Sequence, residues 1–449
     1  MRKIILAVLL FCVSTKAIAQ WSDAYLPEDE NLVDAGLGMA WIDERSFYSI
    51  GLYPNLSIGK VGIGLGIRLL YDSRTGELRR EDWDSFYDYA RILRYVRYGR
   101  KGDPFYGRVG ALHLARLGHG FIMNYYSNQL DYDGRKIGLA LDVDFGTFGF
   151  ESLTSNLGRL EILAGRGFVR PLYSSRVPVL RNLGFGASLA TDVDPDVRRS
   201  TEDGVTVWGV DVELFLLRSK LLSLMVYADH SEIVDYGNGR AVGVGTELDV
   251  LPGFLKVGLN VERRFLGEAF IATFFDPFYE VHRHSTMGEL SAYYETLGGD
   301  PAAVPDVYQP VDESMPIGKK QLLPMMTGKR RSWYAALYAE LLRLVRVMGF
   351  YDRVDGRDAS GRMHLYAGLS QSVPFLALDA SYDKYGMDAF GDIFTLDYRS
   401  MARVGVGYKM MPFLLLYVDY VWSFQWDEEL SQYKPQERFQ PRIAFRYRF

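Results

Sequence analysis

Two clusters contain residue types that could bind a metal ion or carry out nucleophilic catalysis. His282 and His284 could offer two imidazole ligands to a metal ion from one face of a strand. Asp229, His230 and Ser231 place the residue types of a nucleophilic triad side by side. Neighbours in a strand point to opposite faces, so these three side chains cannot meet there. No carboxylate motif of recognised spacing accompanies the histidine pair. The sequence therefore predicts no metal site, no cofactor and no enzyme.

A glycine motif suggests a third kind of site. The pattern Gly62-x-Gly64-x-Gly66 partly matches a nucleotide-binding loop, but it lacks the third spacing and the helix that should follow. The pattern is better explained by glycines in a β-strand, where they leave room for large side chains of neighbouring strands. No run of lysine and arginine is long enough to bind nucleic acid, and the formal net charge of −5 is modest. Neither a nucleotide nor a nucleic acid is predicted as a partner.

The first residues form an export signal rather than part of the fold. Two basic residues precede an apolar run that ends at Val13, and residues 17–19 give a small-x-small cleavage pattern. We therefore expect residues 1–19 to be removed on secretion. The only cysteine, Cys12, lies within them, so the exported chain has neither disulfides nor thiolate chemistry.

Most of the chain after the signal is patterned like β-strands, with hydrophobicity that repeats every two residues. Apolar side chains alternate with small or polar ones at 61–71, 206–216, 242–250 and 414–426. No apolar stretch after residue 20 reaches the roughly 20 residues of a spanning helix. A soluble β-sandwich also alternates. Long strands, glycine and charge on the polar face, and apolar faces that end in Tyr or Trp, as at Tyr408 and Trp422, favour a membrane barrel instead.

We predict an all-β fold: a single transmembrane antiparallel up-and-down β-barrel of about 18 strands, within a range of about 16 to 20. A lead-in at 20–33 precedes the barrel, which occupies 34–449. Short turns alternate with longer polar loops, of which 72–104 and 266–330 are the longest. The doubtful strands lie within 112–135 and 266–330.

The end of the chain resembles a known class of proteins. Ile443, Phe445, Tyr447 and Phe449 alternate with arginine and alanine and finish on an aromatic ring. In this pattern the chain resembles the Gram-negative outer-membrane β-barrel, porin-like proteins, whose last strand ends on Phe. The resemblance implies outer-membrane localisation, lipid around the apolar face, and assembly by periplasmic chaperones and the barrel-assembly machinery. It does not indicate a subfamily or a solute.

A barrel of this width leaves an aqueous channel unless something fills it. The segment 82–98 has helical spacing, with acids first and Arg91, Arg94 and Arg97 later, as the helix dipole prefers. We expect a short helix in an outer loop, lying on the rim or folded inward so that its arginines narrow the pore. The segment 266–330 is too long for a simple loop, and its sequence predicts a lid or a loop with proline breaks.

Charges on the polar faces suggest a field across the lumen. Strand register places basic residues near the first and last strands: Arg68, Arg108, Arg399, Arg403, Arg442 and Arg446. It places acidic residues about half a circumference away: Asp211, Glu213, Asp229, Glu247 and Asp249. A basic wall opposite an acidic wall would orient and filter polar solutes. The alternative is that these charges pair locally with neighbouring strands.

The functional prediction is a channel for diffusion or uptake of small polar solutes. One alternative is a plugged barrel that transports hydrophobic substrates and releases them sideways into lipid. Another is a structural or adhesive barrel whose outer loops bind a partner. A homo-oligomer is compatible with each of these functions.

Overall fold

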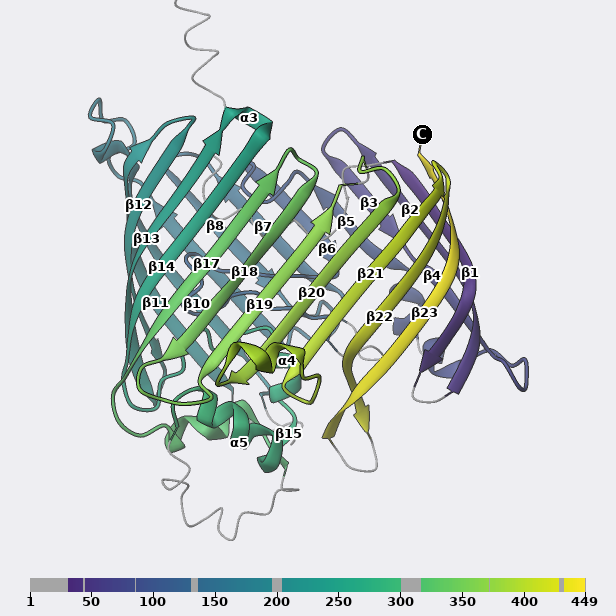
Figure 1. Cartoon of the computed structure of the whole chain (residues 1–449). Helices are drawn as coiled ribbons and strands as arrows, with labels where there is room; N and C mark the ends of the chain where they lie inside the picture. Colours follow the sequence, from purple (N-terminus) through teal and green to yellow (C-terminus); the bar gives the residue numbers. More distant parts are fainter. Residues whose placement is uncertain are drawn as a thin grey trace, which may run out of the picture.

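A single closed antiparallel sheet dominates the structure. The computed structural model describes residues 31–42, 45–84, 86–130, 136–195, 204–299, 316–370, 372–427 and 432–448. Within these residues, 21 strands form one sheet. The first strand, β1 (Leu32–Ile42), pairs with the last, β23 (Gln432–Arg448), and closes the sheet into a barrel (Figure 1). The predicted signal peptide and Phe449 lie outside the described residues.

The other strands follow one another around the wall in chain order. The first half holds β2 (Arg45–Ile58), β3 (Val61–Leu65), β4 (Ile67–Asp72), β5 (Leu93–Tyr98), β6 (Phe105–Gly110), β7 (Gly138–Asp144), β8 (Phe148–Thr154), β9 (Ile162–Val169) and β10 (Leu183–Asp192). The second half holds β11 (Val205–Arg218), β12 (Leu222–Ile233), β13 (Gly237–Val250), β14 (Leu255–Leu266), β17 (Arg330–Leu341), β18 (Val345–Val354), β19 (Gly361–Leu369), β20 (Leu376–Met387), β21 (Ser400–Met411) and β22 (Leu414–Asp427).

Short elements lie in the connections. They are η2 (Arg80–Asp82), α2 (Phe86–Ala90), η3 (Leu180–Asn182), α3 (Leu251–Phe254), α4 (Tyr279–His282), α5 (Met287–Thr296), η6 (Lys319–Met325), η7 (Phe390–Phe394) and the two-stranded pair β15 (Ser285–Thr286) and β16 (Pro316–Ile317). Among the described residues, no helix has both the length and the hydropathy needed to cross a membrane.

The all-β closed barrel is confirmed, and the predicted strand number was slightly low. β3 and β4 both pair with β2 and are separated by Gly66 alone, so they share one position in the wall. The described barrel therefore has twenty strand positions rather than about 18. Its placement in a membrane stays a prediction.

The predicted helix at 82–98 is wrong beyond its first turns. Only Phe86–Ala90 is helical, and Leu93–Tyr98 is the strand β5. In β5 the side chains of Val96 and Tyr98 are exposed while Tyr95 and Arg97 are buried, which is a period of two. Pairing with β3 and β6 satisfies the backbone on both edges. The span 72–104 is thus a connection, a strand and a turn, and not one long loop.

Strand alternation separates two faces throughout the wall. In the final strand Ile443, Phe445 and Tyr447 point outward and are exposed, whereas Ala444 between them is fully buried. The two ends of the barrel also differ. One end carries both Leu32 and Arg448 and most of the short turns, and we call it the short-turn end. The opposite, long-loop end carries most of the long connections.

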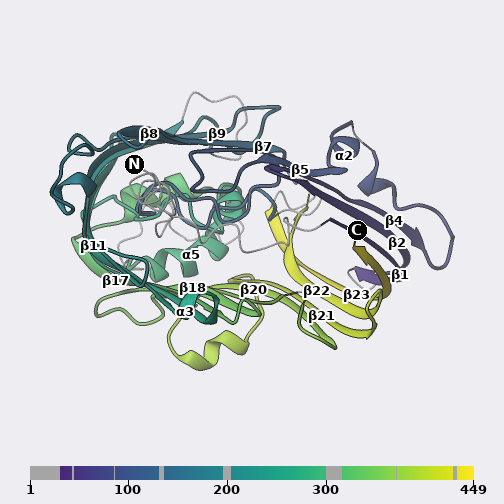
Figure 2. The ribbon, with the colours of Figure 1, turned by 90° about the horizontal axis from the view of Figure 1, so that it is seen from above.

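Two of those long connections fold into the lumen. They are residues 111–130 between β6 and β7, and residues 267–299 with 316–329 between β14 and β17; together we call them the plug. Figure 2 shows α5 inside the ring of strands. Met123 and Phe275 form a parallel bridge that joins the two connections, and both are fully buried. Residues 112–130, in the first span of doubtful strands, are not part of the wall.

Candidate solute cavity

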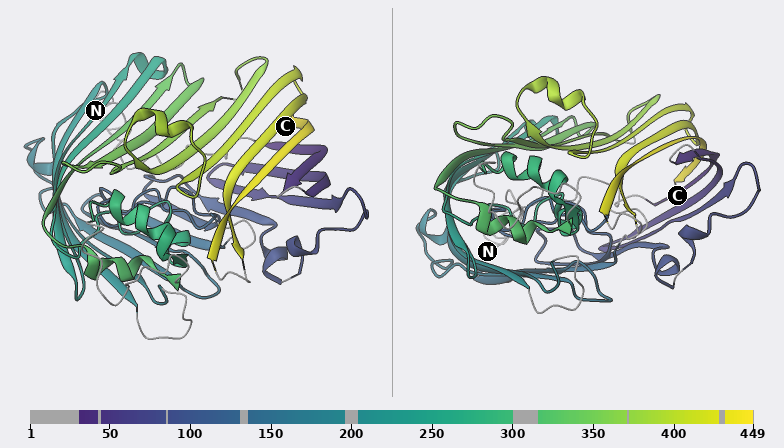
Figure 3. Two further views of the ribbon diagram at one scale, coloured as in Figure 1. Left: turned by 60° about the horizontal axis from the view of Figure 1, so that its bottom comes forward. Right: turned by 90° about the horizontal axis from the view of Figure 1, so that it is seen from below.

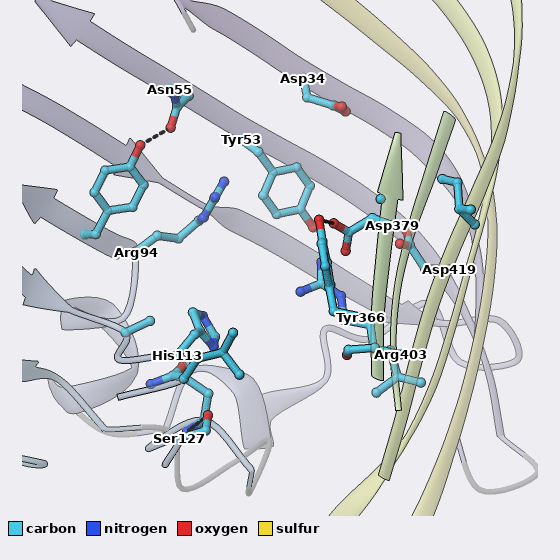
Figure 4. Close-up of a pocket in the computed structure, with 18 of the residues that line it drawn as sticks. Asp34, Tyr53, Asn55, Arg94, His113, Ser127, Tyr366, Asp379, Arg403 and Asp419 are labelled. Atoms are coloured by element: carbon cyan, nitrogen blue, oxygen red, sulfur yellow. Dashed lines mark hydrogen bonds between the residues drawn. The ribbon is translucent and has the colours of Figure 1, made fainter. Parts of the chain in front are cut away.

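The plug leaves part of the lumen open. A cavity of about 880 Å³ lies between the plug and the wall where the barrel closes. It extends from Arg343 and Ser370 at the short-turn end to Pro277 in the plug. Figure 4 shows Arg94 and His113 on one side of it and Arg403 with Tyr366 on the other. The sheet therefore provides the wall of the cavity and the plug limits its width.

The cavity is strongly basic. Among the described residues, its lining includes thirteen lysine or arginine side chains and five acidic ones. The basic side chains are Arg68, Arg91, Arg94, Arg100, Lys101, Arg108, Lys136, Arg343, Arg346, Arg403, Arg438, Arg442 and Arg446, and the acidic ones are Asp34, Glu340, Asp379, Asp383 and Asp419. Three of these cations pair with acids outside the lining: Arg91 with Asp88, Lys101 with Asp142, and Lys136 with Glu161 and Glu280. The other lining side chains still include more basic than acidic groups.

Barrel closure brings five of the six predicted basic residues to this cavity. They are Arg68, Arg108, Arg403, Arg442 and Arg446, which come from the first and last parts of the chain. The sixth, Arg399, does not line the cavity. It lies in the connection before β21, where its Nη2 pairs with Asp397 at 2.7 Å. Arg399 falls outside the strand, so strand alternation does not determine its direction.

Asp34 on β1 joins the two ends of the wall. Its carboxylate accepts hydrogen bonds from Arg442 Nη1 at 2.9 Å and from Arg446 Nη2 at 2.6 Å, both on β23. Arg442 Nε also donates to Asp419 at 3.0 Å, and Arg68 Nη1 donates to Gln440 at 2.9 Å. These charge-assisted bonds hold the arginines in fixed positions along the cavity wall.

A neutral histidine lies among arginines in the middle of the cavity. His113 begins the first plug connection and is half-buried. Enclosure within the barrel, together with the guanidinium groups of Arg108, Arg403 and Arg94, lowers the pKa of His113 to about 3. Arg108 is itself placed over the ring of Tyr95, 4.8 Å from its centroid. The imidazole can therefore donate and accept hydrogen bonds without adding charge.

The arginines that were predicted to narrow the pore lie in the β4–β5 connection and on β5, and not on a helix. Arg91 pairs with Asp88 in the β4–β5 connection, and both Arg91 and Arg94 line the cavity. Arg97 is buried on β5 and donates to the carbonyl of Gly99 at 2.8 Å. None of these arginines is carried on an inward-folded helix.

The glycine motif makes space for the side chains of β5. A Cβ atom at Gly64 would lie 2.4 Å from the ring of Tyr95, and one at Gly66 would lie 2.9 Å from the side chain of Arg94. A crowded wall therefore accounts for Gly62-x-Gly64-x-Gly66.

The predicted acidic wall is paired locally and does not line the cavity. Arg166 holds Asp211 with two hydrogen bonds of 2.9 and 2.6 Å. Glu247 pairs with Lys256 at 3.1 Å, and Asp249 lies opposite Lys256 in the strand register. These acids therefore lie beside basic side chains of nearby strands, as the local-pairing alternative describes, and a field across the lumen stays a prediction.

The remaining two acids bind the plug. His119 lies between them, with Nδ1 3.1 Å from Asp229 and Nε2 3.3 Å from Glu213, and its ring stacks on Tyr227. Burial opposes a charge on His119, but Asp229 and Glu213 outweigh it and raise its pKa to about 10. A buried imidazolium thus ties the first plug connection to β11 and β12.

A second ionic group ties the plug to the wall at the long-loop end. Arg283 contacts Asp192 at 2.9 Å, Glu161 at 2.9 Å and Glu280 at 3.2 Å. Although burial opposes its charge, Lys136 and Arg283 lower the pKa of Glu161 to about 2. The plug is therefore bound to β10 and the neighbouring loop through several ion pairs.

A third contact uses a fully buried arginine of the wall. Arg264 on β14 pairs with Glu262 at 2.7 Å and with Asp352 at 3.2 Å, and its guanidinium lies 4.2 Å from the centroid of Tyr334. Arg264 Nη1 also lies 3.4 Å from Thr273 Oγ1 in the plug. Sequence reasoning missed this group, as it missed His119 and Arg283 as plug contacts. The one available signal was that both plug connections lack a period of two.

The side chains of the two candidate catalytic motifs do not converge on a site. His282 ends helix α4 and is not on a strand, so the pair with His284 is not a strand pair. His230 is a partly exposed residue that lies edge-on to Trp208, whereas Asp229 and Ser231 are buried on the opposite face of β12. The described residues contain no group of three or more side chains suited to hold a metal ion.

Comparisons with known proteins find similarity only among solved structures. No family model and no curated protein matches. OccD3 (OpdP) of Pseudomonas aeruginosa is 10% identical, with coverage of 96% of this chain and 94% of that one and a TM-score of 0.29. The outer membrane protein OpdK of the same species is 9% identical, with coverage of 93% and 98% and a TM-score of 0.31.

A third similar structure is Wzi, an outer membrane protein involved in group 1 capsule assembly in Escherichia coli, which is described as a carbohydrate-binding β-barrel. It is 9% identical, with coverage of 94% of this chain and 85% of that one and a TM-score of 0.33. At these identities and TM-scores the likenesses assign no function to the chain. The structures that it is similar to include outer-membrane β-barrels of Gram-negative bacteria, and no named subfamily is established.

Proposed function

We propose that this protein is an outer-membrane channel through which small polar solutes diffuse, with anions favoured. The observation that supports this function is the basic cavity, with its thirteen cationic and five anionic side chains among the described residues. The apolar outward rows of the strands suit lipid, and the polar inward rows suit a wet lumen.

Selectivity in this proposal comes from fixed charge beside a narrow path. The plug fills the other side of the lumen, so a solute passes close to the arginines of β1–β6 and β21–β23. Such fixed charges raise the local concentration of counter-ions and lower that of co-ions. The cavity volume of about 880 Å³ is within the usual range of sites that bind small molecules.

The test is the reversal potential of single channels in a planar bilayer under a salt gradient. We expect discrete conductance steps with a preference for anions in the mature chain. Arg68→Gln and Arg403→Gln each remove one charge from the cavity wall and should reduce that preference. Arg331→Gln is the matched control, because Arg331 is an exposed residue that does not line the cavity. Equal shifts in all three variants, or a preference for cations, would overturn the proposal.

Lateral release of a hydrophobic substrate is the second candidate. It has one supporting observation: among the named strands β4 pairs only with β2, so the ladder between β4 and β5 is interrupted. Residues 77–79 cover part of the other edge of β4 through a bridge between Tyr71 and Leu78. The cavity wall near this interruption carries Arg68, Arg91 and Arg94, which suit polar cargo better. A folded but silent barrel that purifies with a bound amphiphile would favour lateral release. A silent barrel that captures a partner through its loops would favour the adhesive function.

A further inference from the structure

The connection between β20 and β21 folds against the outside of the barrel. Residues 388–399, with helix η7, are the yellow-green segment that lies outside the ring of strands in Figures 2 and 3. Figure 1 shows the same segment in front of the lower ends of the strands. The plug connections enter the lumen, whereas this connection covers part of the outer face.

Polar contacts hold the connection at both of its ends. Arg353 Nη1 on β18 donates to the carbonyl of Asp388 at 3.1 Å. Lys384 Nζ on β20 donates to the carbonyl of Thr395 at 2.7 Å and to Asp397 Oδ1 at 3.0 Å. The segment between these anchor points therefore has a defined position on the wall.

Lys384 explains why the connection folds back. It pairs in register with Met363, which pairs with Tyr351, so all three belong to the same outward row. A lysine on a lipid-facing row is unfavourable unless its ammonium group finds partners. Lys384 is only 1% exposed, because Thr395, Asp397 and Ser400 surround its ammonium group. The connection thus covers a charge on an otherwise apolar face.

The same segment carries two aromatic rings that are almost fully exposed. Phe390 is 78% exposed and Phe394 is 82% exposed, the highest values among the described large apolar residues. Phe394 precedes Thr395, whose carbonyl accepts a hydrogen bond from Lys384, and Lys384 shares its outward row with Tyr351. Aromatic side chains of this kind are enriched where a membrane meets water. Leu365 on β19, which is 41% exposed, continues the apolar face beside them.

We propose that Phe390 and Phe394 insert into the acyl-chain boundary of the leaflet at the long-loop end, so that residues 388–399 are a lipid anchor beside β18–β20. Lipid is the occupant because Tyr351 and Leu365 make the neighbouring outward face apolar. The two cations beside the segment, Lys384 and Arg353, are held by the segment itself. Amphipathic segments with aromatic side chains bind such boundaries. The inference rests on the outer-membrane location proposed above.

Spin-label accessibility tests the anchor. The only cysteine of the chain is Cys12, inside the predicted signal, so Phe394→Cys gives a single labelling site in the mature protein. The labelled protein is folded into phosphatidylcholine–phosphatidylglycerol vesicles, and relaxation by oxygen is compared with relaxation by a water-soluble nickel chelate. Leu365→Cys is the lipid reference, and Asp358→Cys, in an exposed turn, is the water reference.

An oxygen-to-nickel ratio near that of the Leu365→Cys label supports the anchor. A ratio near that of the Asp358→Cys label overturns it. Low accessibility to both reagents, with dipolar broadening between labels, also overturns it, because a second copy of the chain then covers the rings. If the Leu365→Cys label itself reads as aqueous, the membrane location fails, which is a different result from failure of the anchor alone.

Discussion

Replacing His119 with leucine tests how the plug is held in the lumen. The substitution leaves the buried carboxylates of Asp229 and Glu213 without the imidazolium between them. Removing one partner of a buried ion pair costs about 3–5 kcal/mol. The pKa of His119 gives a similar value: it rises from 6.5 to about 10 on folding, and at about 1.4 kcal/mol for each pH unit the contribution is about 5 kcal/mol.

The sign of the pH dependence follows from the raised pKa. A group whose pKa is higher in the folded state stabilises that state fully below its unfolded pKa of 6.5. The contribution is lost as the pH rises to about 10, where the folded protein also releases the proton. The difference in unfolding free energy between wild type and His119→Leu should therefore be large near pH 7 and small above about pH 10.

Urea unfolding of the refolded barrel in detergent micelles at these two pH values measures that difference. His282→Leu is the matched control, because burial, together with Lys319 and Arg362, lowers the pKa of His282 to about 3. Its effect should be the same at neutral and alkaline pH. If the His119→Leu difference also stays constant between the two pH values, His119 is not held in its charged form and the reasoning is refuted.

Three further predictions concern other parts of the molecule. Arg283→Met removes the guanidinium that contacts Asp192 and should weaken the attachment of the plug by about 3–5 kcal/mol. Single-channel recordings should then show larger conductance steps. Unchanged steps would mean that the plug does not limit the conductance. Val406→Arg places a charge on the outward face of β21 and should destabilise the barrel in vesicles by about 2–4 kcal/mol if the site is near the bilayer midplane, measured as a lower urea midpoint; an unchanged midpoint would mean that this face is wet. Lys384→Met removes the anchor point of residues 388–399, so chymotrypsin, which cuts after the aromatic residues of that connection, should cleave it faster, and an equal rate would show that the lysine does not hold it.

The sequence was informative wherever structure depends on neighbours along the chain. Alternation in a strand is local, so the outward Ile443, Phe445 and Tyr447 could be identified from spacing alone, and the barrel class followed. The same logic placed Arg442 and Arg446 on the lumen side. It failed at β5, whose six residues are too few for a period of two to outweigh the helical spacing of the segment around it.

The tertiary structure decided how the lumen is filled and which charges stay open to it. His119 and Asp229 are separated by 110 positions, Tyr126 and Glu280 by 154, and Arg442 and Asp34 by 408. These pairs form only when the barrel closes and the plug enters it, because they depend on the whole set of strand registers and have no periodic signal. The sequence alone determined a barrel with an apolar outer face and a charged lumen. Long-range packing determined that one side of that lumen is plugged and that the remaining cavity is basic.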